Sequence, residues 1–127
     1  MSSPPRPTDA ELEILAVLWS RGPSTVRDVH AAINKRKPAQ YSTVLKFLQI
    51  MAEKGLVRRD EEQRAHVYQA ARPREWTQRQ LAGDLLQRGF NGSAKSLMMG
   101  ALSARKASKE ELAEMRRLLD EYEKGEK

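Results

Sequence analysis

Residues 41–59 read YSTVLKFLQIMAEKGLVRR, a helix-forming run that ends at a glycine and continues into a short basic segment. We expect a helix from about Gln40 to Lys54, with Gly55 as the left-handed residue that stops it. At roughly 100° per residue, one side of this helix is apolar and should face a core. The apolar side chains are Val44, Phe47, Leu48 and Met51. The opposite side is polar, and folding alone does not account for it.

Two helices are expected before this one, and each opens with a capping box. Thr8 and Glu11 form the first box, and the helix ends at about Ser20. Thr25 and Asp28 form the second, and a basic run closes that helix. Apolar residues recur at helical spacing in both, namely Leu12, Leu15, Ala16 and Trp19, then Val26, Val29 and Ile33.

Two short segments after Gly55 alternate apolar with polar residues, as strands do. Residues 56–59 and 65–68 are the candidate strands, and residues 60–64 form a polar loop between them. The pair predicts one β-hairpin, which must pack on the helices because two strands alone are marginally stable. Three helices followed by a hairpin is the order of a winged helix-turn-helix. The fold class is therefore mainly α with a small β-hairpin.

Three more helices are expected between Pro73 and the C-terminus. Pro73 suits a helix start, Ser93 caps the next helix, and Ser108 opens a capping box for the last. The last helix carries Leu112, Met115, Leu119 and Tyr122 at the spacing of a coiled-coil seam. We expect this seam to pack into an intersubunit core with Leu97, Met98 and Leu102. The alternative is that these helices fold back on their own domain.

The chain is thus expected to have three parts. Residues 1–7 form a flexible leader without the apolar stretch of a signal peptide. Residues 8–72 form a winged-helix DNA-binding domain, and residues 73–127 form a helical dimerisation region. Its link to the first domain is a hinge near residues 71–74.

Composition narrows the function classes. The net charge is +6 and the isoelectric point is about 9.8, which fits a nucleic-acid partner or an anionic membrane surface. The chain has no cysteine, so disulfides and thiolate metal sites are excluded, and a reducing cytoplasm is expected. No metal, no cofactor and no catalytic residues are predicted, because no nucleophile motif or phosphate-binding loop occurs. The two histidines, His30 and His66, are interpreted as buried, or in the case of His66 as a phosphate contact.

The polar side of the 40–54 helix suggests contact with DNA. An α-helix fits the major groove, where outward side chains contact base edges. Ser42, Thr43, Lys46 and Gln49 supply short and long hydrogen-bonding groups there. The alternative is a merely solvated face, and Glu53 at its end favours that alternative mildly.

Basic residues of the hairpin are expected to complete the contact with double-stranded DNA. Arg58, Arg59, Arg64 and His66 would meet backbone phosphates. The run Lys35–Lys37 could contact the phosphates of the flanking DNA backbone. Alternatively, its positive charge could serve only to stabilise the C-terminal end of the helix and to keep it solvated. The competing function is a winged-helix protein-interaction module without sequence-specific DNA binding.

Three stretches resemble a known family in their order and spacing. They are TDAELEILAVLWSRGPSTVRDVHAAI at 8–33, YSTVLKFLQIMAEKGLVRR at 41–59 and RAHVYQA at 64–70. Together they resemble the penicillinase repressor (BlaI/MecI) family, over about residues 8–122. The resemblance implies a cytoplasmic homodimeric repressor with an N-terminal winged helix. Such a repressor occupies a palindromic operator, often of β-lactam resistance genes.

The resemblance also implies how the repressor is released. In well-known members, a membrane-embedded metalloprotease sensor cleaves an Asn-Phe bond in the dimerisation region. The corresponding position here is Gly100-Ala101, which is not an Asn-Phe pair. Cleavage at this bond would require a protease of different preference, so another route of derepression stays open.

Overall fold

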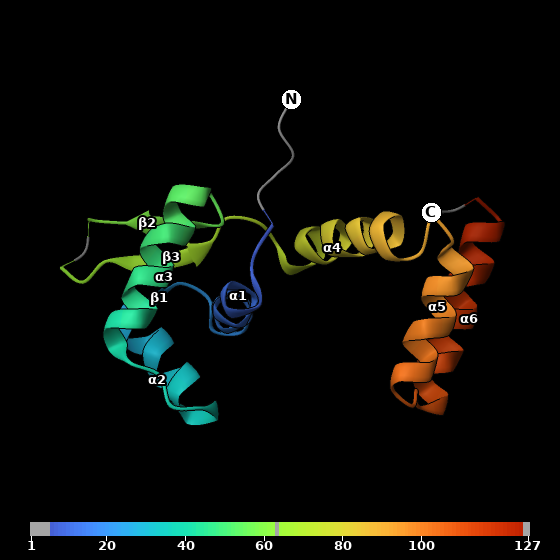
Figure 1. The fold of residues 1–127 in the computed structure, drawn as a ribbon, viewed down its shortest axis with the longest axis horizontal. Coiled ribbons are helices and arrows are strands. Elements are labelled where there is room, and N and C mark those ends of the chain that lie inside the picture. Colours follow the sequence, from blue (N-terminus) through green and yellow to red (C-terminus); the bar gives the residue numbers. More distant parts are fainter. Residues whose placement is uncertain (1–5, 63, 126–127) are drawn as a thin grey trace. The chain divides into compact units, whose positions relative to one another are not determined.

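A computed structural model describes residues 6–62 and 64–125 of the chain (Figure 1). They divide into two compact units, one up to Ala82 and one from Gly83 onward. Most of the expected leader and the last two residues of the expected dimerisation region lie outside the described residues.

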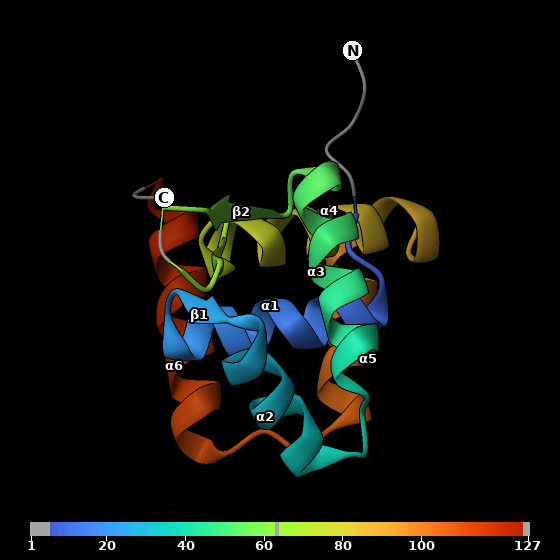
Figure 2. The same cartoon turned by 90° about the vertical axis from the view of Figure 1, so that its left-hand side faces the viewer.

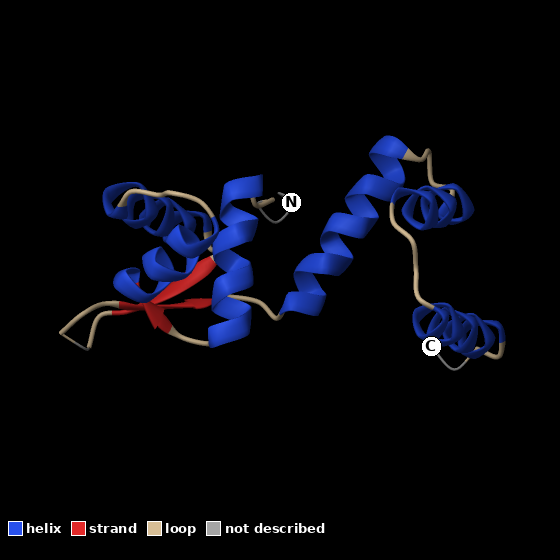
Figure 3. Ribbon diagram, turned by 90° about the horizontal axis from the view of Figure 1, so that it is seen from below, coloured by secondary structure: helices blue, strands red, loops and turns tan. Residues whose placement is uncertain are grey.

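The first unit contains three helices and three strands, followed by the start of α4. Their bounds are α1 Asp9–Arg21, β1 Ser24–Thr25, α2 Val26–Arg36, α3 Tyr41–Lys54, β2 Val57–Asp60 and β3 Val67–Ala70. Figure 3 shows the connection between β2 and β3 extending away from the helices. We call the hairpin of residues 57–70 the wing. This is the winged-helix order that the sequence predicts.

Local hydrogen bonds confirm the predicted ends of the first three helices. The Glu11 amide donates to the Thr8 hydroxyl at 3.2 Å, and Glu11 accepts from the Thr8 amide at 2.9 Å. Thr25 and Asp28 repeat this reciprocal pair at 3.1 and 3.2 Å. Gly55 ends α3 at a φ of 82°, in the left-handed region that favours glycine. These ends are set by residues close in sequence, which is why the sequence predicts them.

The sheet differs from the expected two-stranded hairpin. β3 lies between β1 and β2 and pairs antiparallel with both. The predicted second strand, residues 65–68, begins two residues later in the structure, at Val67. Because strand alternation repeats every two residues, this shift leaves Tyr68 on the core face. β1 was missed because two residues are too few to show a period.

One apolar core holds the first unit together. It is built from α1, α2, α3, β2 and β3, whose fully or nearly buried residues are Ile14, Leu15, Leu18, Val26, Val29, Ile33, Val44, Leu48, Met51, Val57 and Tyr68. Three of the four residues expected on the inner side of α3 are buried, and Phe47 is only partly buried. The core thus fixes which side of α3 faces outward.

The start of α4 (Arg74–Gly89) contacts α1 through Arg74. The Trp19 indole N–H donates to the Arg72 carbonyl at 3.0 Å, and the Arg74 guanidinium lies 5.8 Å from the centre of the Trp19 ring. Thr77 is buried. Trp19 therefore lies at the edge of the core, and its indole N–H fixes the segment that leads into α4.

The second unit consists of the end of α4, α5 (Ala94–Ala104) and α6 (Lys109–Glu123). Ser93 and Ser108 cap the last two helices, by accepting from the Ser96 and Glu111 amides at 3.1 and 3.0 Å. No described residue of this unit is fully buried. Large apolar side chains remain exposed on it, namely Leu85, Met98, Met99, Leu118, Leu119 and Tyr122.

Candidate nucleic-acid interface

The outward side of α3 carries the four polar residues that the sequence singles out. Ser42, Thr43, Lys46 and Gln49 are all exposed, while Val44, Leu48 and Met51 on the other side are buried. We call these four exposed residues the recognition face. In Figure 2, α3 crosses the side of the first unit that is turned toward the viewer. Within the described residues of this unit, no segment covers the recognition face.

The C-terminal end of α3 is fixed to α1 by an ion pair. The Lys54 ammonium donates to the two carboxylate oxygens of Glu11 at 2.8 and 3.1 Å. Glu11 is only 2% exposed, although it is charged. Burial opposes its ionisation, but the hydrogen bonds from Lys54 and Thr8 outweigh burial and lower the pKa of Glu11 below its ordinary value.

The N-terminal end of α3 is fixed by the turn that precedes it. His30 Nε2 lies 2.7 Å from the Ala39 carbonyl oxygen, and the Ala39 amide donates to the Asn34 side chain at 3.0 Å. The His30 ring also meets the Tyr41 ring edge-on, with centroids 5.8 Å apart. His30 is half-buried and serves this turn. Within the described ranges, no group of three or more His, Asp or Glu side chains converges as a metal site.

The four basic residues expected in the wing are all exposed, but they do not share one face. In β2, Arg58 lies opposite Gln69 and Arg59 lies opposite Tyr68 in the ladder. Successive strand residues point to opposite faces, so Arg58 and Arg59 diverge. The Tyr68 hydroxyl and Glu61, whose carboxylate is 3.3 Å away, raise the pKa of Arg59.

A groove of about 620 Å³ lies between α2, α3 and the wing. It brings together four of the predicted DNA contacts with residues that the sequence did not single out. Gln49, Arg59, Arg64 and His66 line it, together with Arg27 and Tyr41. Arg58, Ser42, Thr43 and Lys46 are not among the lining residues. Arg27 was missed because only the pairing of β1 with β3 brings the start of α2 to the wing.

The basic run at the end of α2 is only partly available. The Lys37 ammonium donates to Glu13 on α1 at 3.2 Å, in a pair that is exposed to solvent. Lys35 and Arg36 are exposed. Lys37 would therefore have to leave Glu13 before it could contact a phosphate.

The residues expected at a dimer interface lie on α5 and α6 of the second unit. Leu97, Leu102, Leu112 and Met115 are half-buried. Met98, Leu119 and Tyr122 are 39%, 52% and 63% exposed. Gly100 and Ala101, the candidate cleavage position, are exposed within α5.

Comparison with known proteins identifies the family. Residues 7–121 match the penicillinase repressor family. The transcriptional regulator BlaI of Mycobacterium tuberculosis is 34% identical over 119 residues, which cover 92% of this chain and 85% of that protein. The penicillinase repressor of Bacillus licheniformis is 25% identical over 127 residues, which cover 100% and 99% of the two chains.

Two of the solved structures that resemble this chain match a little over half of it. One is the solution structure of monomeric Bacillus licheniformis BlaI in complex with the blaP half-operator, with a TM-score of 0.51 and 25% identity. It covers 59% of this chain and 92% of that one. The other, the DNA-binding domain of the repressor BlaI, has a TM-score of 0.51 and 26% identity and covers 58% and 90%.

The winged-helix fold and the match to known repressors place this chain in the class of DNA-binding transcriptional repressors. With a match over residues 7–121, the chain belongs to the penicillinase repressor family. Among residues 6–62 and 64–125, no helix combines the length and apolar character needed to cross a membrane.

Proposed function

We propose that this repressor binds a palindromic DNA operator as a homodimer and thereby blocks transcription in the cytoplasm. Each α3 enters the major groove with Ser42, Thr43, Lys46 and Gln49 toward the base edges. Arg58, Arg59, Arg64 and His66 of the wing contact the phosphate backbone. No enzymatic activity is part of this proposal.

One observation carries the DNA proposal, namely the division of α3 into two sides. Val44, Leu48 and Met51 hold one side in the core at 3% exposure or less. Ser42, Thr43 and Lys46 on the other side are exposed near the N-terminal end of the helix, where helix-turn-helix proteins contact bases. Both ends of the helix are tethered, by His30 and by Lys54. A rigid element that presents hydrogen-bonding groups suits base recognition.

The exposed apolar residues of α5 and α6 support the homodimer. Met98, Leu119 and Tyr122 are each more than a third exposed, and their burial against a second copy would remove this surface from water. A twofold interface uses the same patch on both copies. It would place two recognition helices one helical turn of DNA apart, about 34–36 Å, or a multiple of that distance.

We further propose that the repressor controls β-lactam resistance or related genes and is released by proteolysis. The family match supports the first part of this proposal. Gly100–Ala101 is the candidate bond, and a membrane metalloprotease sensor is the candidate protease. Because this bond lies inside α5, the helix must open locally before cleavage, and Gly100 lowers the cost of opening by about 1 kcal/mol relative to alanine.

In vitro selection of bound DNA from random sequence tests the proposal. We expect a palindromic consensus whose half-sites lie one turn or a multiple apart. The control is a chain in which Lys46 and Thr43 are replaced by alanine, which should recover no consensus. A wild-type chain that recovers no consensus would overturn DNA recognition and favour a protein-interaction module. A consensus without dyad symmetry would overturn the homodimer.

Release by proteolysis needs a separate experiment. We expect the chain isolated from β-lactam-treated cells to contain a fragment that begins at Ala101, detectable by mass spectrometry. The matched control is the same chain from untreated cells. An intact chain together with derepressed target genes would overturn cleavage as the route of release.

A further inference from the structure

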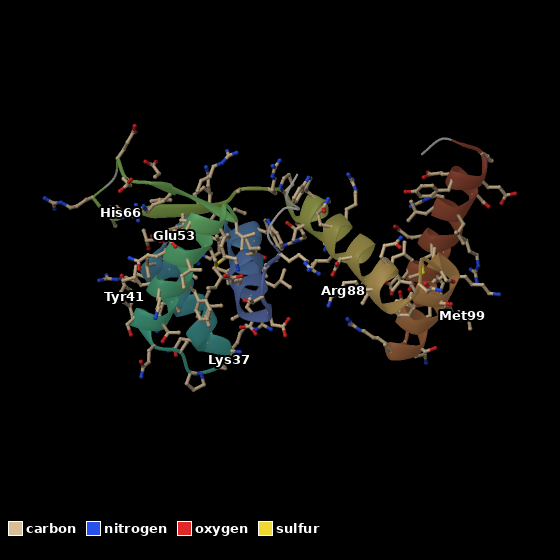
Figure 4. All side chains as sticks on the ribbon, turned by 45° about the horizontal axis from the view of Figure 1, so that its top comes forward. Lys37, Tyr41, Glu53, His66, Arg88 and Met99 are labelled. Atoms are coloured by element: carbon tan, nitrogen blue, oxygen red, sulfur yellow. The ribbon has the colours of Figure 1, made fainter. Side chains whose placement is uncertain are left out.

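The groove between α2, α3 and the wing has a strongly basic lining. Three arginines and a histidine border it, contributed by three separate elements of the first unit. Arg27 comes from α2, Arg59 from β2, and Arg64 and His66 from the end of the wing connection. No carboxylate is among the described residues that line the groove. Figure 4 shows Tyr41 and His66 on the same side of the unit.

The position of the groove indicates its occupant. The major groove of DNA is bordered by the two sugar–phosphate strands, and an α-helix fills its width of about 12 Å. A protein surface that rises directly beside the inserted helix must therefore meet one of these strands. Here that surface is the wing on one side and the start of α2 on the other. The positive charges around the groove are complementary to the negative charge of the strand.

We propose that this groove seats one sugar–phosphate strand of the bound duplex, with Arg27 and Tyr41 as phosphate-positioning residues. This inference rests on the proposed function, because it requires α3 to lie in the major groove. It adds two residues to the contacts expected from the sequence. Arg59, Arg64 and His66 border the strand in this arrangement. Arg58 points to the other face of β2 and does not line the groove.

Tyr41 is held in a suitable position before DNA arrives. It is the first residue of α3 and is 48% exposed, although its ring packs edge-on against His30. This contact limits the motion of the ring, so little conformational entropy is lost when the hydroxyl donates to a phosphate oxygen. His30 is itself bonded to the turn before α3, and the Tyr41 position is thereby coupled to that of the helix.

Arg27 is placed by the third strand. β1 pairs Thr25 with Val67 of β3, and this pairing holds the first turn of α2 next to the wing. Arg59 across the groove is already paired with Glu61 and must exchange this carboxylate for a phosphate. The Glu61 side chain is 61% exposed, so the exchange costs little. Arg27 and Arg59 then approach the strand from opposite sides.

The dependence of DNA affinity on salt tests the inference. The probes are a duplex that carries the selected consensus and a scrambled duplex of equal length. We expect Arg27→Gln to weaken binding to both duplexes by the same factor, because phosphate contacts carry no sequence information. The slope of log affinity against log salt should become shallower by about one for each bound protomer, and thus by about two for the dimer. Arg79→Gln, at an exposed position on α4, is the matched control and should leave the slope unchanged.

Tyr41→Phe separates a hydrogen bond from a charge. We expect binding to both duplexes to weaken about tenfold, with an unchanged salt slope, because the hydroxyl is neutral.

A single neutral methylphosphonate, moved along the selected duplex, should locate the phosphate that Arg27 contacts. At that position it should weaken wild-type binding and have no further effect on Arg27→Gln. Thermal unfolding of each variant shows whether the fold is retained.

The outcomes distinguish this inference from the proposed function. A wild-type chain without preference for the selected duplex would overturn the proposed function. A wild-type preference that persists while Arg27→Gln keeps the full salt slope would overturn the inference alone. A loss confined to the selected duplex would also overturn it, because that result indicates a base contact. A wild-type chain that binds neither duplex would overturn both.

Discussion

The Lys54 ammonium, in the last turn of α3, lies 2.8 Å from a carboxylate oxygen of Glu11 on the buried side of α1. Glu11 also accepts from the Thr8 amide, so one carboxylate caps the first helix and anchors the third. The recognition face therefore has its position set at one end by a single ion pair. Glu11 and Lys54 are 43 residues apart in sequence.

Removal of this anchor should destabilise the first unit. Lys54→Met leaves the Glu11 carboxylate buried without its cation, and we expect the free energy of unfolding to fall by about 2 kcal/mol. Urea titration followed by circular dichroism measures it. Lys35→Met is the matched control, because Lys35 is also in the last turn of a helix but is exposed. Equal effects of the two substitutions would contradict the role of the ion pair.

The same carboxylate predicts how stability depends on pH. The pKa of Glu11 is lowered from its ordinary value of 4.5 in the folded chain, and that of Asp28 is lowered from 3.8. A lowered folded-state pKa contributes stability above the unfolded value, and this stability is lost as pH falls through the folded pKa. We expect the free energy of unfolding to decrease below about pH 4.5, and less steeply for Glu11→Gln. Denaturant titrations at several pH values measure the unfolding free energy of the wild type and of Glu11→Gln. The prediction is refuted if this free energy falls equally steeply with decreasing pH in both.

The two sides of α3 should respond differently to truncation. Leu48 is fully buried and Ile50 is 37% exposed, on the same helix. Leu48→Ala should cost about 2–5 kcal/mol of unfolding free energy, because it leaves a cavity in the core. Ile50→Ala should change it by about 0.5 kcal/mol. Chemical denaturation of both variants is the measurement, and a similar cost at the two positions would mean that α3 is rotated from the described orientation.

Lys46 should carry sequence discrimination. If it contacts a base, Lys46→Ala should weaken binding to the selected duplex by about 1–3 kcal/mol and relax the preference at one position. Binding to a scrambled duplex should change much less. Fluorescence anisotropy with both duplexes measures the difference. An equal loss on both would place Lys46 against a phosphate instead.

The apolar surface of α6 should be required for self-association. Leu119 is 52% exposed, and Leu119→Asp would place a charge in the proposed interface. We expect the variant to sediment as a monomer at concentrations where the wild type is a dimer. Ala113→Asp is the control, because Ala113 is exposed on the same helix, six residues before Leu119 and about 120° away around the helix axis. A wild-type chain that is monomeric at all concentrations would exclude the dimer.

Much of the first unit follows from local sequence. The two reciprocal capping pairs and the left-handed Gly55 involve residues within a few positions of one another, so the helix ends are predictable from spacing. The pattern around Val57 and Tyr68 predicts the two strands of the wing, although the second strand starts two residues later than expected. The two-residue strand β1 has no pattern of its own, and it forms only because β3 is available beside it.

At the candidate site, the chemistry of the recognition face follows from the spacing of side chains along α3. A helix must bury its apolar side, so Val44, Leu48 and Met51 force the polar side chains of α3 outward. Tertiary structure alone decided which basic residues meet across the groove. Arg27 reaches the wing through β1–β3 pairing, and β2–β3 pairing places Arg59 opposite Tyr68, on the face of the wing that borders the groove. The physical reason is that side-chain periodicity is encoded locally, whereas the pairing of distant segments depends on the assembled core.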